Sequence, residues 1–99
     1  MRHRLIFKPL ARFELEQAIA WYEQQRPGLG KELQSELALV LEQIRTKPER
    51  FPKVTARARK ARLRRFPFSV YFTSASESIG VLAIFHAKRD PEVLRRRLP

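Results

Sequence analysis

Two stretches with the periodicity of a helix, separated by a short segment rich in turn-forming residues, constrain the fold of this chain most strongly. Apolar residues recur every three or four positions over 11–22 and again over 33–44, which is the pattern of amphipathic helices. The segment 24–30 contains one proline and two glycines, and it interrupts the first pattern. The dipeptide Lys47-Pro48 ends the second, because a residue before proline disfavours helical backbone. We therefore expect a hairpin of two antiparallel helices.

The first helix carries two neighbouring aromatic residues on or beside its apolar stripe. Tyr22 continues the stripe and Trp21 lies next to it, so we expect both rings to belong to the core, although each could also stack on a base or a partner. Glu14 and Glu16 fall mostly among the polar positions of this helix. The sequence therefore predicts one buried apolar face and one polar face.

Segments with the pattern of strands precede and follow this hairpin in the sequence. The predicted strands are 3–8, 60–64, 68–73 and 79–85. The last of these is apolar on both faces, which is typical of a central strand. Asp90 followed by Pro91 indicates the start of a further helix near the end of the chain. The order β-α-α-β-β-β predicts an α+β fold, with the helical hairpin packed on one face of an antiparallel sheet.

Composition narrows the class of protein. The chain has 99 residues, of which 43% are hydrophobic, so we expect a single globular domain over 1–99. No apolar run approaches the length of a membrane span, and charges come too early for a signal peptide, so a cytoplasmic protein is expected. With no cysteine and only two histidines, we expect neither a disulfide scaffold nor a metal or other cofactor site.

Positive charge is concentrated in the second half of the chain. Of 21 basic and ten acidic residues, residues 51–99 hold twelve basic and only three acidic ones, and the whole chain carries a net charge of +11. Residues 53–65 contain seven cations and no acid. Such one-sided density favours an anionic partner, either a nucleic acid or an acidic protein segment, over a merely solvated surface.

Five short segments then appear in a characteristic order. They are AIAWYE (18–23), GLG (28–30), PERFP (48–52), RRFPFSVY (64–71) and HAKRDP (86–91). Together they resemble the RelE/ParE toxins of type II toxin–antitoxin systems. The resemblance implies the β-α-α-β-β-β fold and a cognate acidic antitoxin, whose disordered segment wraps around the toxin and folds on binding.

The resemblance leaves two targets open. RelE-like members cut messenger RNA on the ribosome, whereas ParE-like members poison DNA gyrase. The cations that such ribonucleases use match Lys60, Arg62, Arg64 and Arg89. However, Ser69 stands in place of a further arginine and Leu94 in place of the C-terminal tyrosine or histidine. Because that proton-transfer group is absent, we favour a ParE-like toxin acting on gyrase, with a metal-independent endoribonuclease as the alternative.

Two side chains could supply missing chemistry if the protein is a ribonuclease. Arg89 would offset negative charge that develops on phosphorus, and His86 or Tyr71 would transfer protons. A structural role for His86 at the end of its strand is the simpler interpretation, because no carboxylate is near it in sequence. A third hypothesis is an inactive member of the family that only binds its antitoxin.

The predicted contact residues fall into two groups. The first group, expected to bind the antitoxin or a nucleic acid, comprises Lys60, Arg62, Arg64, Arg65 and Arg89. The second group comprises Arg95, Arg96 and Arg97, which could reach the cellular target or simply form a frayed terminus. This hypothesis requires the first group to share one concave surface.

Overall fold

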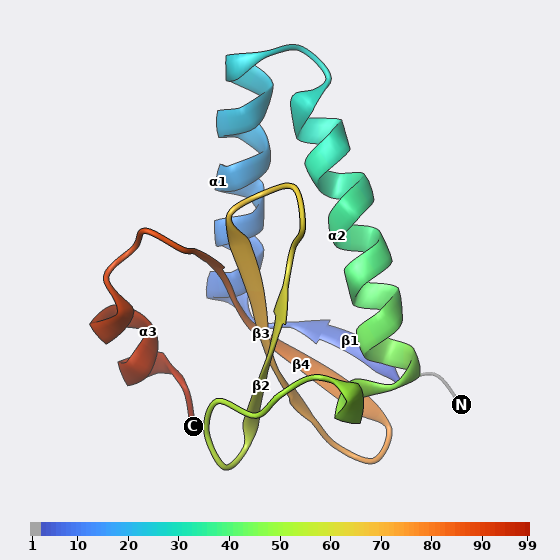
Figure 1. The fold of residues 1–99 in the computed structure, drawn as a ribbon. Coiled ribbons are helices and arrows are strands. Elements are labelled where there is room, and N and C mark those ends of the chain that lie inside the picture. Colours follow the sequence, from blue (N-terminus) through green and yellow to red (C-terminus); the bar gives the residue numbers. More distant parts are fainter. Residues whose placement is uncertain (1–2) are drawn as a thin grey trace.

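A four-stranded sheet carries a helical hairpin on one face and a short helix on the other in the computed structural model, which describes residues 3–99 (Figure 1). The elements are β1 (Arg4–Phe7), α1 (Pro9–Gln25), α2 (Leu29–Thr46), the 3-10 turn η1 (Pro48–Arg50), β2 (Ala58–Arg62), β3 (Phe68–Ser74), β4 (Ser78–His86) and α3 (Pro91–Arg97). The predicted α+β class and element order are confirmed, and each predicted element lies within a few residues of its observed position.

The sheet is mixed rather than wholly antiparallel. Its strand order is β1-β4-β3-β2, with β3 antiparallel to both β2 and β4. β1 pairs in parallel with β4, so the antiparallel description was wrong for this one edge. The alternation of side chains along a strand indicates which face of the sheet each residue occupies, but it does not indicate the direction of the strand. The helical hairpin is a connection long enough for a later strand to run parallel to β1. The prediction that the doubly apolar strand is central is confirmed, because β4 lies between β1 and β3.

The two helices of the hairpin meet closely at a glycine. Gly30 belongs to α2, and a Cβ there would lie 2.8 Å from the carbonyl oxygen of Ile19 in α1, so the helices can approach only with glycine at this position. Gly28 precedes α2 with φ of 91°. The Glu23 carboxylate accepts hydrogen bonds from the Gly28 and Gly30 N–H groups at 2.9 and 3.0 Å, which satisfies free donors at the start of α2. The link between the helices is therefore shorter than the sequence suggested.

Two apolar clusters hold the layers together. The largest fully buried side chains between the hairpin and the sheet are Phe72, Leu33, Ile44, Ile79, Val70 and Val81. On the opposite face, Leu94 of α3 packs with Tyr71, Ala83 and Phe85. Asp90 caps α3, since its side chain accepts the N–H of Glu92 at 2.9 Å. The C-terminal segment is therefore a docked helix rather than a frayed tail, and Figure 1 shows it on the side of the sheet away from α1 and α2.

β4 extends beyond the strand that covers its outer edge. β1 pairs only with Ser78–Val81, so the second half of β4 has a neighbouring strand on one side only. A β-bulge begins where that cover ends, because Phe72 pairs with Val81 and Tyr71 pairs with Ala83, which leaves Leu82 as the extra residue. This uncovered half of β4 forms one wall of the site described next.

Candidate docking groove

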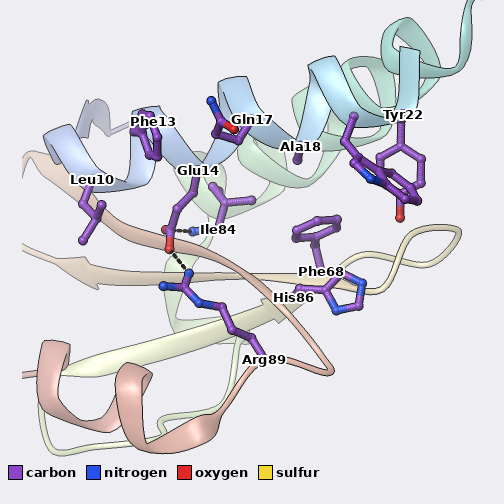
Figure 2. Close-up of a pocket in the computed structure, with 11 residues that line it drawn as sticks. Leu10, Phe13, Glu14, Gln17, Ala18, Tyr22, Phe68, Ile84, His86 and Arg89 are labelled. Atoms are coloured by element: carbon purple, nitrogen blue, oxygen red, sulfur yellow. Dashed lines mark hydrogen bonds and ion pairs between the residues drawn. The ribbon is translucent and has the colours of Figure 1, made fainter. Parts of the chain in front are cut away.

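An open cavity of about 530 Å³ lies between α1 and the uncovered half of β4 (Figure 2). We call it the α1–β4 groove. Its lining residues are Leu10, Phe13, Glu14, Gln17, Ala18, Trp21, Tyr22, Phe68, Ile84, His86 and Arg89. Most of these are apolar or aromatic, with a carboxylate, an arginine and a histidine among them. The groove therefore offers apolar contact with a few fixed polar groups.

A second stripe on α1 creates this groove. Leu10, Phe13, Gln17 and Trp21 are spaced three or four residues apart, and they follow a different face of the helix from the core stripe. Leu10, Phe13 and Trp21 are 48%, 55% and 56% exposed. The expectation of a core position was therefore wrong for Trp21. It is confirmed for Tyr22, whose ring packs edge-on at 5.0 Å from that of Phe66.

The polar base of the groove is Glu14, a residue that the sequence placed among the polar positions of α1. Its side chain is only 8% exposed, and Figure 2 shows it pointing from α1 toward β4. One carboxylate oxygen accepts the backbone N–H of Ile84 at 3.0 Å. The other accepts hydrogen bonds from Arg89 and Arg97, both at 2.6 Å. Arg97 also donates to the carbonyl oxygen of the bulged residue Leu82 at 2.7 Å.

This network has two consequences. Burial raises the pKa of Glu14, but hydrogen bonds from Arg97, Ile84 and Arg89 outweigh it, so the pKa lies below its usual range and the carboxylate stays charged. In addition, the side chains of Glu14 and Arg97 occupy the backbone groups of Ile84 and Leu82 that a further strand would use. The uncovered edge of β4 is therefore capped at these positions.

His86 has a structural hydrogen bond. Its Nδ1 accepts the backbone N–H of Lys88 at 2.9 Å, which holds the turn after β4, and its ring packs edge-on at 5.0 Å from that of Phe68. This agrees with the simpler interpretation of a structural histidine at the end of its strand. Figure 2 shows the histidine beside Phe68 at the Tyr22 end of the groove, whereas the guanidinium of Arg89 points to Glu14.

The predicted binding cations do not share one concave surface. Lys60 lies over the Tyr71 ring at 5.8 Å, on the same side of the sheet as α3, and Arg62 follows two residues later on the same face of β2. Arg65 instead pairs with Glu32 of α2 at 2.6 Å. The backbone N–H groups of Arg64 and Arg65 both donate to Glu36 of α2. Arg89 pairs with Glu14 of α1. The prediction of one shared basic surface was therefore wrong.

Sequence adjacency misled here because a turn redirects the chain after β2. Residues 64 and 65 lie in the link between β2 and β3. Glu32 and Glu36 of α2 bind this link, so it lies apart from the face that carries Lys60. Hydrogen bonds from Arg65 and Arg26 hold the pKa of Glu32 below its usual range despite some desolvation. Lys53, Arg57 and Arg59, from the same run of cations, lie on yet another part of the surface.

Two of the cations that a ribonuclease would use lie over neighbouring aromatic rings. Lys60 lies over the ring of Tyr71 and Arg89 over that of Phe85, and the centroids of the two rings are 6.4 Å apart. Leu94 packs on this aromatic pair and is itself buried. Ser69, at the position of the missing arginine, is buried as well.

The three C-terminal arginines have different surroundings. Arg95 pairs with Glu92 within α3, and Arg96 is exposed. Arg97 is only 17% exposed because it is bound to Glu14 and to the carbonyl oxygen of Leu82. In this conformation Arg97 therefore holds α3 against the fold, and only Arg95 and Arg96 face solvent.

Across residues 3–99, no helix has the length and hydropathy needed to cross a membrane. The same part of the chain contains no group of three or more histidine or carboxylate side chains arranged to hold a metal ion.

Fold and groove together define a small α+β protein with exposed apolar residues beside an uncovered strand edge. Comparison with known proteins gives the family. The model of the ParE toxin of the type II toxin–antitoxin system parDE matches residues 5–91, so the chain belongs to the ParE toxin family. It is a ParE-like toxin of a type II system.

A solved structure supports the fold. The chromosomal ParDE toxin–antitoxin system from P. aeruginosa contains a chain that is similar to this one with a TM-score of 0.75 and 18% sequence identity. The similarity covers 88% of this chain and 98% of that chain. A search of curated protein sequences finds no match.

Proposed function

We propose that this toxin inhibits growth in the cytoplasm by acting on DNA gyrase, and that a cognate acidic antitoxin neutralises it by docking in the α1–β4 groove. The observation that carries the docking site is the exposure of Leu10, Phe13 and Trp21 on one stripe of α1. Contiguous exposed apolar residues in a small protein mark an interaction surface. Aromatic side chains in such a patch contribute most of the binding free energy.

The polar groups of the groove specify the chemistry of the docking segment. Arg89 lines the groove and is 44% exposed, so it can pair with a carboxylate of the antitoxin as well as with Glu14. Because Glu14 and Arg97 already occupy the edge of β4, the segment binds through side chains rather than by extending the sheet. An amphipathic segment with apolar residues on one face and acidic residues flanking them meets both requirements.

Two observations favour gyrase over messenger RNA as the target. Leu94 stands at the position of the expected proton-transfer residue, and the Nδ1 of His86 already accepts the N–H of Lys88. Arg95 and Arg96 are the exposed cations of α3 and are the candidates for contact with gyrase.

Expression of the toxin alone, and together with a small acidic protein if a neighbouring gene encodes one, tests this proposal. We expect growth to stop with the toxin alone, covalent gyrase–DNA complexes to accumulate, and co-expression to restore growth. Messenger RNA from the same cells is probed for new cleavage ends. Cut messenger RNA without gyrase–DNA complexes would favour the ribonuclease instead, and unimpaired growth would favour the inactive family member.

A further inference from the structure

A second cavity, unrelated to the α1–β4 groove, lies on the sheet face that carries α3. It also has a volume of about 530 Å³. Its lining residues are Ile6, Lys8, Lys53, Ala56, Arg57, Arg59, Thr73, Ser74, Ala75, Ser78, Gly80 and Pro99. We call it the basic cavity. Its lining residues come from all four strands and from the segment before β2, so residues distant in sequence build it together.

The shape of the cavity depends on the strands beneath it. Thr73 of β3 pairs with Gly80 of β4, and Ile6 of β1 pairs with the same glycine. A Cβ at position 80 would lie 3.0 Å from the Thr73 hydroxyl oxygen. Glycine therefore leaves room around this hydroxyl, and α3 packs farther along the sheet on Tyr71 and Phe85.

The cationic side chains of the basic cavity have no acidic side chain beside them in its lining. Four of the lining residues are cations, Lys8, Lys53, Arg57 and Arg59, and none is an aspartate or a glutamate. No ion pair within residues 3–99 involves any of these four side chains. Arg59 is held in place by donating to the carbonyl oxygen of Phe51 at 2.6 Å. Elsewhere in the fold, several arginines are paired with carboxylates, as Arg65 is with Glu32 and Arg97 with Glu14.

Positive charge beside hydroxyl groups is the chemistry of phosphate recognition. Guanidinium and ammonium groups bind phosphate oxygens, and the hydroxyls of Thr73, Ser74 and Ser78 can donate to the same oxygens. Clustered like charges also repel one another, so binding of an anion relieves an unfavourable field. An acidic peptide would need apolar anchors as well, and exposed aromatic residues line the α1–β4 groove rather than this cavity.

We propose that the basic cavity binds phosphate groups of a DNA backbone. We expect this binding not to depend on the base sequence of the DNA, because contacts with the phosphate backbone carry no information about the bases. The basic cavity shares no lining residue with the α1–β4 groove. A toxin that acts on a DNA-bound enzyme would thereby contact the DNA as well as the enzyme, but the binding itself does not depend on the target being gyrase.

Binding of a fluorescent DNA duplex, measured by anisotropy over a series of salt concentrations, tests the proposal. The variant Lys53→Gln/Arg57→Gln removes two exposed cations from the cavity while Arg59 and its hydrogen bonds remain. We expect the affinity to fall roughly tenfold and the slope of log affinity against log salt to decrease by about two. The control Lys31→Gln/Lys47→Gln removes the same charge from exposed positions outside the cavity.

The outcomes separate the sources of phosphate and the other class of partner. Equal losses in the variant and the control, or no binding of the duplex by the wild-type protein, would overturn the proposal. Binding of pyrophosphate or ATP without binding of the duplex would also overturn it, as would selective loss of antitoxin affinity in the cavity variant. Circular dichroism and thermal unfolding of each variant establish that it is folded.

Discussion

Glu14 shows how one buried carboxylate can connect three parts of this fold. It lies on α1 and binds the backbone of β4, the arginine after β4 and the last arginine of α3. Burying a charge is costly unless it is paired and hydrogen-bonded, and here both conditions are met. The helical pattern of the sequence could not identify this role, because the donors to Glu14 come from residues 70 or more positions away.

Replacing Glu14 with glutamine should destabilise the protein substantially. Glu14→Gln leaves the mostly buried Arg97 without its counter-charge, so we expect the free energy of unfolding to fall by about 3 kcal/mol. Urea denaturation measures the change. Glu16→Gln, at an exposed position on the same helix, is the matched control and should change it by less than about 0.5 kcal/mol. Equal effects of the two substitutions would show that the ion pair contributes nothing.

The same residue should make stability depend on acidity. Because the folded-state pKa of Glu14 lies below the ordinary value of 4.5, its contribution is complete at higher pH and is lost as the pH falls through the folded-state pKa. Urea denaturation repeated from neutral pH to below 4.5 should therefore show the wild-type protein losing its advantage over Glu14→Gln. If the two stability curves stay parallel throughout, Glu14 does not titrate as proposed.

At the level of elements, α3 is a short helix held by few contacts. Leu94 is its one buried side chain, and it packs against Tyr71, Ala83 and Phe85. Arg97 supplies the polar attachment to Glu14. A helix this short is not stable alone, so packing must hold it. The basic composition of this segment suggested a terminus free to fray, whereas its single leucine and its aspartate cap are the features that predict a docked helix.

Truncating Leu94 should release α3 locally. Leu94→Ala removes most of the buried contact of the helix, and we expect a loss of about 2–3 kcal/mol in unfolding free energy. Trypsin should also cleave at Arg95 and Arg96 faster than in the wild-type protein, because local opening exposes the backbone. Leu39→Ala, an exposed leucine on α2, is the control and should leave both measurements nearly unchanged. Unaltered cleavage in Leu94→Ala would mean that Leu94 does not hold the helix.

Over the whole molecule, local patterns predicted the elements better than they predicted the surfaces. The helical hairpin and the central strand follow from periodicity, because each reflects burial of residues close in sequence. Surfaces depend on how distant segments meet. The run of cations over 53–65 is one feature in the sequence, but the structure divides it between the basic cavity, the face under α3 and the side of α2.

The α1–β4 groove was missed for a related reason. The spacing of Leu10, Phe13 and Trp21 is a helical stripe visible in the sequence, yet a second stripe on α1 is indistinguishable from a wide core face until the sheet is in place. The uncovered half of β4 depends on where β1 ends, and no local pattern specifies that. One signal in the sequence could have indicated the site: the first helix has more apolar residues than a single buried face can hold.

The affinity of purified variants for the cognate antitoxin, measured by calorimetric titration, tests the docking groove most directly. Trp21→Ala and Phe13→Ala should each weaken binding by about 2 kcal/mol, roughly 30-fold, while Leu39→Ala, which removes an exposed leucine outside the groove, should change it by less than about threefold. If all three variants bind the antitoxin as tightly as the wild-type protein does, the antitoxin does not dock in the α1–β4 groove.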